Sequence, residues 1–261
     1  MVVAMIKLVV SDVDGTLLRS GQKGIPKEVF GMIRMLKEKG ILFAVASGRP
    51  FVDLKHLFEE AAEDIVFIAS DGAYISYKSQ VIAKYPIDRE AGFALMSEIY
   101  MQTEAEVAAY GAYMCYMIPK KEEFGAYFRE SVRNHVESVS CMRGVSEDYL
   151  KIGIYHSENV EKHAGAIASY WNDKLHRVYH SDNWIEYTAA GVHKGTGLDK
   201  LMKTFDIKSE EVLAFGDNYN DKEMLALAGC AYAMSDAPEE IKKLCGYETQ
   251  NPVETVRTLV G

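Results

Sequence analysis

The sequence predicts an α/β protein whose doubly wound parallel sheet is interrupted by an inserted α/β domain. The chain has 261 residues, which is enough for two units that each bury a core. Toward both ends, short continuous apolar runs alternate with segments of helical periodicity, as parallel strands covered on both faces require. The middle of the chain follows a different rhythm, with paired strands and many aromatic side chains. We therefore predict one core from residues 1–83 and 190–261, and an insert from residues 84–189.

The N-terminal part is predicted to alternate strand and helix. Strands are expected at residues 6–10, 41–46 and 65–69, with helices between them at residues 26–39 and 51–61. The first helix has a proline near its start and Gly40 just beyond its end, which are common boundary residues. Short connections between such elements imply right-handed crossovers. Residues 1–4 are expected to be a short extension, because Met5 would serve equally well as a start.

The insert is predicted to carry its own sheet and helices. Its helices are expected at residues 88–103, 122–137 and 160–171, and its strands within residues 107–118 and at residues 149–155, 175–180 and 184–188. After Gly191 the first pattern resumes. The elements expected there are a helix at 196–205, a strand at 212–215, a helix at 221–228, a final strand at 230–233 and a final helix at 237–244. The two ends of the chain would therefore build one core together.

Composition limits the partners of the chain. The formal net charge is −9 and no block of lysines or arginines occurs, so we expect no binding to nucleic acid, which needs a concentrated basic surface. No apolar run approaches the roughly 18 residues that span a bilayer, so we expect no membrane partner. The N-terminus lacks a basic leader and a cleavage site, which argues against a signal peptide. The four cysteines form no C-x-x-C pair, which indicates reduced thiols and a cytoplasmic protein.

Four groups of polar residues fall where ligands bind in parallel sheets, outside the carboxyl ends of the strands. They are residues 12–16 (Asp-Val-Asp-Gly-Thr), 47–49 (Ser-Gly-Arg), 193–196 (His-Lys-Gly-Thr) and 216–221 (Gly-Asp-Asn-Tyr-Asn-Asp). Each group alone could be a turn, a surface loop or a helix cap. Their occurrence in order, at predicted strand ends and before a predicted helix, makes a shared site the better interpretation.

The group at residues 12–16 places two carboxylates two residues apart at the end of a buried strand. Such a pair can hold a divalent cation and offer one oxygen as a nucleophile. Gly15 lets the chain turn sharply, and Thr16 can donate to an anion. These residues indicate metal-assisted chemistry on an anionic substrate.

These four motifs, in this order along the whole chain, resemble the haloacid dehalogenase superfamily and, within it, the Cof-type phosphatases. The resemblance implies that the insert between the second and third motifs is the large α/β cap of that subfamily. It also implies a short helical turn and a β-hairpin flap over residues 18–25. The implied activity is hydrolysis of small phosphorylated metabolites, such as sugar phosphates or a phosphorylated cofactor, with Mg²⁺ and an aspartyl-phosphate intermediate.

The resemblance also distributes roles among the motif residues. Asp12 is expected to be the nucleophile, and Asp14 the general acid and base that serves the leaving alkoxide and then the attacking water. The expected Mg²⁺ ligands are Asp12, Asp14 through its backbone carbonyl, Asp217, and Asp221 in support of a metal-bound water. The residues expected to bind phosphoryl oxygens are Val13, Ser47, Gly48, Lys194 and Asn220.

Several alternatives stay open at this point. A phosphomutase or phosphotransferase would use the same intermediate, and a non-catalytic module could bind a phosphorylated ligand. Arg49 follows the second motif without an assigned role. Asp71 stands where Cof-type chains usually carry asparagine before glycine, so it is either a turn residue or a substrate contact. In the insert, tyrosines such as Tyr110 and Tyr127 are expected in the core, and Glu186 lies on a strand just before the chain returns.

Overall fold

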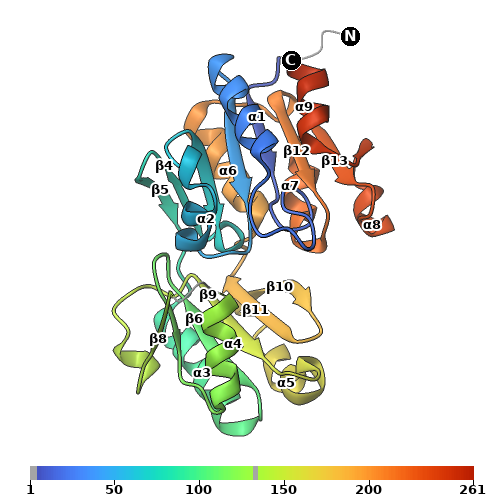
Figure 1. Cartoon of the computed structure of the whole chain (residues 1–261). Helices are drawn as coiled ribbons and strands as arrows, with labels where there is room; N and C mark the ends of the chain where they lie inside the picture. Colours follow the sequence, from blue (N-terminus) through green and yellow to red (C-terminus); the bar gives the residue numbers. More distant parts are fainter. Residues whose placement is uncertain (1–4, 132–134) are drawn as a thin grey trace.

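Two β-sheets, each flanked by helices, organise the computed structural model of the chain, which describes residues 5–131 and 135–261. They form two lobes, and the chain passes between the lobes after β5 (Gln80–Lys84) and after β11 (Trp184–Ala189) (Figure 1). This is the α/β class that the sequence predicts. Residues 1–4, expected to be a short extension, lie outside the described residues.

The first sheet has eight strands, and β1 lies in its interior. In spatial order the strands are β14 (Tyr247–Thr249), β13 (Cys230–Met234), β12 (Val212–Gly216), β1 (Leu8–Ser11), β2 (Leu42–Ala46), β3 (Ile65–Ala69), β4 (Tyr74–Tyr77) and β5. Strands β14 to β3 run parallel, whereas β4 and β5 add antiparallel pairs at one edge. The chain leaves β1 toward β2 on one side and returns beside it as β12, so the switch point where ligands bind lies at β1.

Helices cover both faces of the first sheet. They are α1 (Lys27–Glu38), α2 (Phe51–Leu57) and α9 (Pro252–Val260) on one face, and α6 (Lys194–Phe205), α7 (Lys222–Leu227) and α8 (Glu239–Lys242) on the other. Successive residues of a strand point to opposite faces. In β1, Val9 therefore packs into the core beneath the first group of helices, and Val10 into the core beneath the second. Burial on both sides explains the continuous apolar run of this strand.

The second sheet has six strands, which pair antiparallel except for β7 with β8. In spatial order they are β10 (Leu175–Ser181), β11, β9 (Lys151–Tyr155), β6 (Glu106–Tyr110), β7 (Cys115–Met117) and β8 (Val136–Ser138). The helices on it are α3 (Arg89–Gln102) and α5 (Val160–Ser169) on one face, and α4 (Glu122–Ser131) on the other. In β9, Ile152 and Ile154 pack with α3 and α5, so Lys151 points to the opposite face.

The strands of the second sheet all lie between residues 106 and 189, and those of the first sheet lie on either side of that range. The limits of the insert at residues 84 and 189 stay a prediction. In the part of the chain that the structure describes, no helix is both long and apolar enough to cross a membrane.

The flap expected over residues 18–25 is wrong. In the described structure this stretch forms turns and loop, with neither a helix nor a paired strand beyond one bridge. That bridge joins Asp14 to Leu18, and the N–H of Leu18 donates to the carbonyl oxygen of Val13. These contacts fold the chain back directly after β1, so the segment closes as a tight loop.

The helix expected over residues 122–137 is too long. α4 ends at Ser131, and Val136–Ser138 forms β8, which pairs with β7. Residues 132–134 of the expected helix lie outside the described residues. Pairing with β7 at the sheet edge is a tertiary contact, and it overrides the local preference of this polar stretch.

The strand at 230–233 and the helix at 237–244 are not the final elements, because β14 and α9 follow them. β14 has three residues at the sheet edge and is largely exposed, so it carries little apolar pattern. α9 begins after Asn251, whose side chain caps the helix by accepting from the N–H of Val253.

Candidate active site

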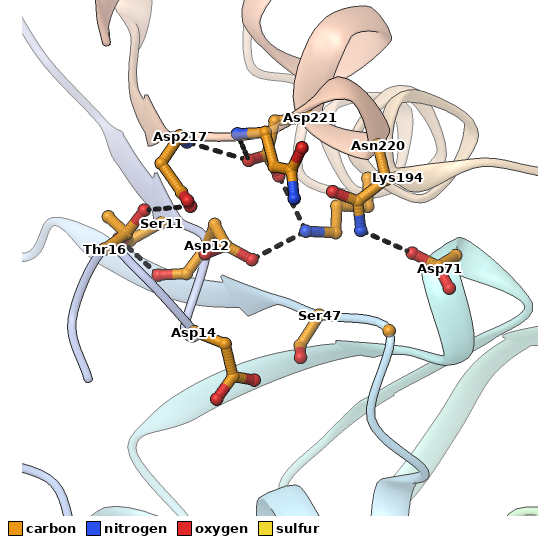
Figure 2. Close-up of polar contacts among 12 residues, drawn as sticks. Ser11, Asp12, Asp14, Thr16, Ser47, Asp71, Lys194, Asp217, Asn220 and Asp221 are labelled. Atoms are coloured by element: carbon orange, nitrogen blue, oxygen red, sulfur yellow. Dashed lines mark hydrogen bonds and ion pairs between the residues drawn. The ribbon is translucent and has the colours of Figure 1, made fainter. Parts of the chain in front are cut away.

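The carboxyl ends of β1, β2 and β12 meet at one edge of the first sheet, beside the first turn of α6 (Figure 2). Residues 12–16 follow β1, residues 47–49 follow β2, and residues 217–221 follow β12. Lys194 is the first residue of α6, and the side chain of His193 caps this helix. The topology therefore brings together four groups that are far apart in the sequence.

Lys194 lies at the centre of this site between two carboxylates. Its Nζ donates to Oδ1 of Asp12 and to Oδ1 of Asp221, each at 2.6 Å, and its side chain is only 1% exposed. Burial on its own would lower the pKa of Lys194, but the two carboxylates outweigh burial and raise that pKa above its usual value. Lys194 therefore carries a positive charge, which offsets the cost of burying Asp12.

Asp217 is placed by the loop that carries Gly15 and Thr16. The hydroxyl of Thr16 donates to Oδ1 of Asp217 at 3.0 Å. Gly15 has a φ of +95°, and a Cβ atom there would collide with the carboxylate of Asp217. Glycine meets both demands, since it lacks a Cβ atom and adopts positive φ readily. The motif glycine therefore lets Asp217 approach the end of β1.

Three carboxylates form a group that could hold a divalent cation. Ligand atoms of Asp12, Asp217 and Asp221 all lie within 4.8 Å of one another. Oδ2 of Asp12 is buried and has no hydrogen-bond partner among the described residues. Burial raises the pKa of Asp12 well above its usual range despite Lys194, and repulsion from the other two carboxylates adds to the rise. Clustered hard oxygens with uncompensated charge fit a divalent cation.

Asp221 differs from the other two carboxylates because both of its oxygens already accept hydrogen bonds. Oδ1 accepts from Lys194, and Oδ2 accepts from the N–H of Asp217 at 2.9 Å and of Asn218 at 3.0 Å. A Cβ atom at Gly216 would lie 2.8 Å from Asp221, so the loop closes tightly around this side chain. Asp221 is therefore better placed to orient Asp217 than to offer a free oxygen.

The carboxylate of Asp14 points away from this group (Figure 2). Arg49 holds it through an ion pair. Nε and Nη2 of Arg49 donate to the two oxygens of Asp14, each at 2.7 Å, and Nη1 donates to Asp53 at 2.6 Å. The Asp14 side chain is 48% exposed, unlike the buried Asp12. Arg49, left without a role by the sequence, therefore orients Asp14.

The residues predicted to bind phosphate come from the same edge. Ser47 is buried, and its hydroxyl accepts from the N–H of Arg49 at 3.2 Å. Gly48 lines a cavity beside it. The side chain of Val13 is buried in the core of the first sheet, so only its backbone can face a ligand.

Asn220 and Asp71 contact each other at the carboxyl ends of the strands of the first sheet. Nδ2 of Asn220 donates to Oδ1 of Asp71 at 3.0 Å. Asp71 is buried and has a φ of 53°, in the left-handed region. Asp71 therefore occupies a turn after β3, as one interpretation expects, and its carboxylate contacts a predicted site residue. A contact between Asp71 and the substrate stays a prediction.

A cavity of about 330 Å³ lies between this edge and the second sheet. The predicted site residues that line it are Asp12, Asp14, Ser47, Gly48, Asp217 and Asn220. The inserted segment contributes Tyr110, Tyr127, Ser131, Lys151, Trp184 and Glu186. The size and the mixed polar and aromatic lining suit one small molecule.

Some residues at the cavity have no role in the sequence-based prediction. They are Lys151, Asp53, Arg49 and Glu186. Lys151 donates to Oε2 of Glu186 at 2.7 Å, and both side chains are buried. For Lys151, the signal in the sequence is a lysine at the start of an otherwise apolar strand. For Asp53 the signal was its position four residues after Arg49 at the start of a helix.

Comparisons with known proteins identify similar chains. A family model described as haloacid dehalogenase-like hydrolase matches residues 9–255. The 5-amino-6-(5-phospho-D-ribitylamino)uracil phosphatase YbjI of Escherichia coli is 29% identical over 244 residues, covering 93% of this chain and 90% of the relative. The phosphatase YitU of Bacillus subtilis, named for the same substrate, is 26% identical over 253 residues, covering 93% and 91%. A crystal structure from Eubacterium rectale superposes with a TM-score of 0.90 at 27% identity, covering 98% of this chain and all of that one.

Proposed function

Because the chain belongs to the haloacid dehalogenase-like hydrolase family, we propose that it is a Mg²⁺-dependent phosphatase that forms an aspartyl-phosphate on Asp12. The family match confirms the resemblance drawn from the motifs, and the named relatives are phosphatases. The observation that carries the proposal is the Lys194 ammonium between Asp12 and Asp221, next to Asp217. A module that only binds a phosphorylated ligand has no need of this arrangement.

Asp12 has one oxygen held and one oxygen without a partner. Lys194 binds Oδ1, while Oδ2 is the buried atom that lacks a hydrogen bond among the described residues. A phosphate dianion repels a carboxylate, so attack by Asp12 requires positive charge nearby. When bound by Asp12 and Asp217, Mg²⁺ would supply part of that charge. Lys194 supplies the rest, and Asp221 keeps Lys194 and Asp217 in place.

Asp14 is the proposed general acid and base. It lies two residues after Asp12, lines the cavity and is not part of the buried carboxylate group. It would protonate the leaving alkoxide and then take a proton from the attacking water. Arg49 holds its carboxylate in one orientation through two parallel hydrogen bonds.

The phosphoryl oxygens are proposed to bind among fixed donors at and beside the cavity, which Ser47, Gly48 and Asn220 line. The donors are the backbone of Val13, the Ser47 hydroxyl, the Gly48 N–H, the Lys194 ammonium and the Asn220 amide. Donors that are fixed before the reaction stabilise charge on transferring phosphoryl oxygens without reorganising.

The substrate class is proposed from the relatives and the cavity. YbjI and YitU are named for a phosphorylated polyol attached to a pyrimidine ring. The inserted residues 84–189 would act as a cap over the cavity, and Tyr127 and Trp184 give its lining an aromatic part. We therefore propose a small phosphorylated polyol or sugar, with or without a ring, as the substrate. Cytoplasmic location stays a prediction.

The decisive experiment measures phosphate release by purified protein with Mg²⁺. We expect hydrolysis of para-nitrophenyl phosphate and of 5-amino-6-(5-phospho-D-ribitylamino)uracil. Asp12→Asn should lower kcat about 10³-fold or more, because an amide is a poor nucleophile. Asp199→Asn, which changes an exposed carboxylate on α6, is the matched control and should keep the wild-type rate. Phosphate transfer to an added polyol in place of release would favour a phosphotransferase.

Two results would contradict the proposal. One is a wild-type rate in the Asp12→Asn protein. The other is the absence of phosphate release from a broad panel of phosphate esters by the wild-type enzyme.

A further inference from the structure

Lys151 is a buried lysine of the second sheet whose side chain reaches the first sheet. It begins β9 in the second sheet, and its side chain is 3% exposed. Its Nζ donates to the carbonyl oxygen of Gly48 at 2.6 Å and to Oε2 of Glu186 at 2.7 Å, with Oδ2 of Asp71 at 3.4 Å. Gly48 and Asp71 belong to the edge of the first sheet, whereas Glu186 lies on the adjacent strand β11.

The protein itself occupies the donors of Lys151. An ammonium has three N–H donors, and three oxygen atoms of the protein lie within 3.4 Å of this one. Burial on its own would lower the pKa of Lys151, but Glu186 and Asp71 outweigh it and hold that pKa above its usual value. Lys151 is therefore charged and lines the cavity, yet it has no donor left for a substrate.

The contacts of Lys151 lead to two groups that are proposed to bind phosphate. The first contact is to the carbonyl oxygen of Gly48 itself. The second runs through Asp71, whose other oxygen accepts from Asn220 at 3.0 Å. A Cβ atom at Gly48 would lie 3.0 Å from Oδ2 of Asp71, so the Asp71 carboxylate packs closely against this glycine. One lysine of the second sheet therefore contacts the Gly48 loop directly and the Asn220 loop through Asp71.

We propose that Lys151 is a positioning residue of the phosphate site that the second sheet supplies. It sets Gly48 directly and Asn220 through Asp71, so the phosphate-binding loops are complete only when the second sheet is seated against the first. This inference rests on the proposed phosphatase function. When the second sheet moves away, Lys151 leaves together with Glu186, because the two lie on adjacent strands of the same sheet. Phosphate then binds tightly in the closed protein and weakly in the open one, which favours product release.

Equilibrium binding of inorganic phosphate in the presence of Mg²⁺ tests this proposal without turnover. The variant combines Lys151→Met with Glu186→Gln. Removing the Lys151 cation together with the nearby Glu186 charge avoids leaving the Glu186 carboxylate buried without its cation. We expect phosphate affinity to fall about tenfold or more, because the Lys151 ammonium no longer holds the Gly48 carbonyl and its loop in the binding geometry. A hydrogen bond to a charged group is worth about that factor. A purely structural role would lower the melting temperature and leave phosphate affinity unchanged.

Lys84→Met is the matched control. Lys84 also joins the first sheet to the inserted segment, through an ion pair with Asp148, but both side chains are exposed and neither lines the cavity. This variant should keep the wild-type phosphate affinity. An equal loss in Lys84→Met would overturn the proposal, as would wild-type affinity in a folded double variant.

Lys151→Arg replaces the double variant if that protein does not fold. It keeps the charge, but a planar guanidinium cannot meet three acceptors arranged around an ammonium. Phosphate affinity should therefore fall again, and wild-type affinity in this variant would also overturn the proposal. Phosphate release by the wild-type enzyme judges the proposed function separately. If the wild-type enzyme releases no phosphate while the variants still bind phosphate more weakly than the wild-type protein, the phosphatase function is wrong and the positioning role stands.

Discussion

The two sheets meet the cavity in different ways. The first sheet offers its strand ends: Asp12, Ser47 and Asp217 each follow directly on a strand. The second sheet offers the side of its strands, where Lys151 and Glu186 point from β9 and β11. Strand-end loops fix backbone donors and carboxylates relative to one another, whereas a strand face moves with its sheet as one body. The reaction and the selection of the substrate can therefore depend on separate parts of the site.

The largest effect should come from the strand-end side, at Lys194. Lys194→Met leaves Asp12 and Asp221 buried without their cation, which should cost about 3–5 kcal/mol of unfolding free energy. We expect kcat to fall about 10³-fold or more toward every ester, since the charge that offsets the phosphate dianion is lost. Urea denaturation and phosphate release measure the two effects. Lys203→Met, on the exposed side of the same helix, should change neither. A loss of kcat confined to large esters would show that Lys194 acts in substrate selection, and the strand ends would then not be limited to the reaction.

Metal binding should depend on the strand ends alone. Saturating Mg²⁺, at about 100 times its Kd, should raise the unfolding free energy of the wild-type protein by about 2–3 kcal/mol. Mg²⁺ should raise the unfolding free energy of Asp217→Asn much less, because this variant lacks one of the clustered carboxylates. Thermal denaturation with Mg²⁺ and with a chelator measures the gain. Asp199→Asn should respond like the wild-type protein, and a full Mg²⁺ response in Asp217→Asn would remove Asp217 from the metal site.

A smaller effect is expected at Arg49, which follows β2, lines the cavity and holds the carboxylate of Asp14. Arg49→Lys loses the paired hydrogen bonds to Asp14, so we expect kcat to fall about 10- to 100-fold for alkyl phosphates. Para-nitrophenolate is a weak base that leaves without a proton, so its phosphate ester should be affected much less. Parallel kcat measurements on the two esters check this. Equal losses would show that Arg49 does not act through protonation of the leaving group.

The smallest effect should come from the strand face, at Trp184. Trp184→Phe trims the aromatic lining of the cavity, and we expect KM for the ribitylaminouracil phosphate to rise about three- to tenfold. KM for glycerol phosphate should not change, because that leaving group has no ring. Steady-state kinetics on the two substrates would sharpen the division between strand ends and strand face. A similar change for both substrates would assign Trp184 to cap stability.

The strand-end part of the site was accessible to sequence reasoning because each group is contiguous. Residues 12–16 and 216–221 are local motifs at strand ends, and adjacent parallel strands bring such ends together. Which charged side chains pair with one another could not be fully predicted from the sequence. The motif predicts that Lys194 binds phosphoryl oxygens, but its equal contacts with Asp12 and Asp221 depend on how the loop after β12 closes.

The strand-face part was not accessible because its residues are dispersed. Lys151 has meaning only once β9 is known to turn this side chain toward the first sheet, and no local pattern states which face meets another sheet. The β4–β5 hairpin has no counterpart among the predicted elements for a related reason. Lys78 and Ser79 at its turn both have positive φ, where such turns usually carry asparagine or glycine. The expected flap over residues 18–25 came from the resemblance and not from the residues, and it is wrong.

The ion pair between Asp12 and Lys194 has a consequence for how this protein is made. The two residues are 182 positions apart, so at about 5–20 residues per second the ribosome needs roughly 10–40 s to synthesise the chain between them. During that interval Asp12 lacks its partner Lys194, and β1 lacks its neighbour β12. The second sheet, whose strands all lie within the interval, can fold first. The first sheet is therefore expected to be completed last, after the insert has folded.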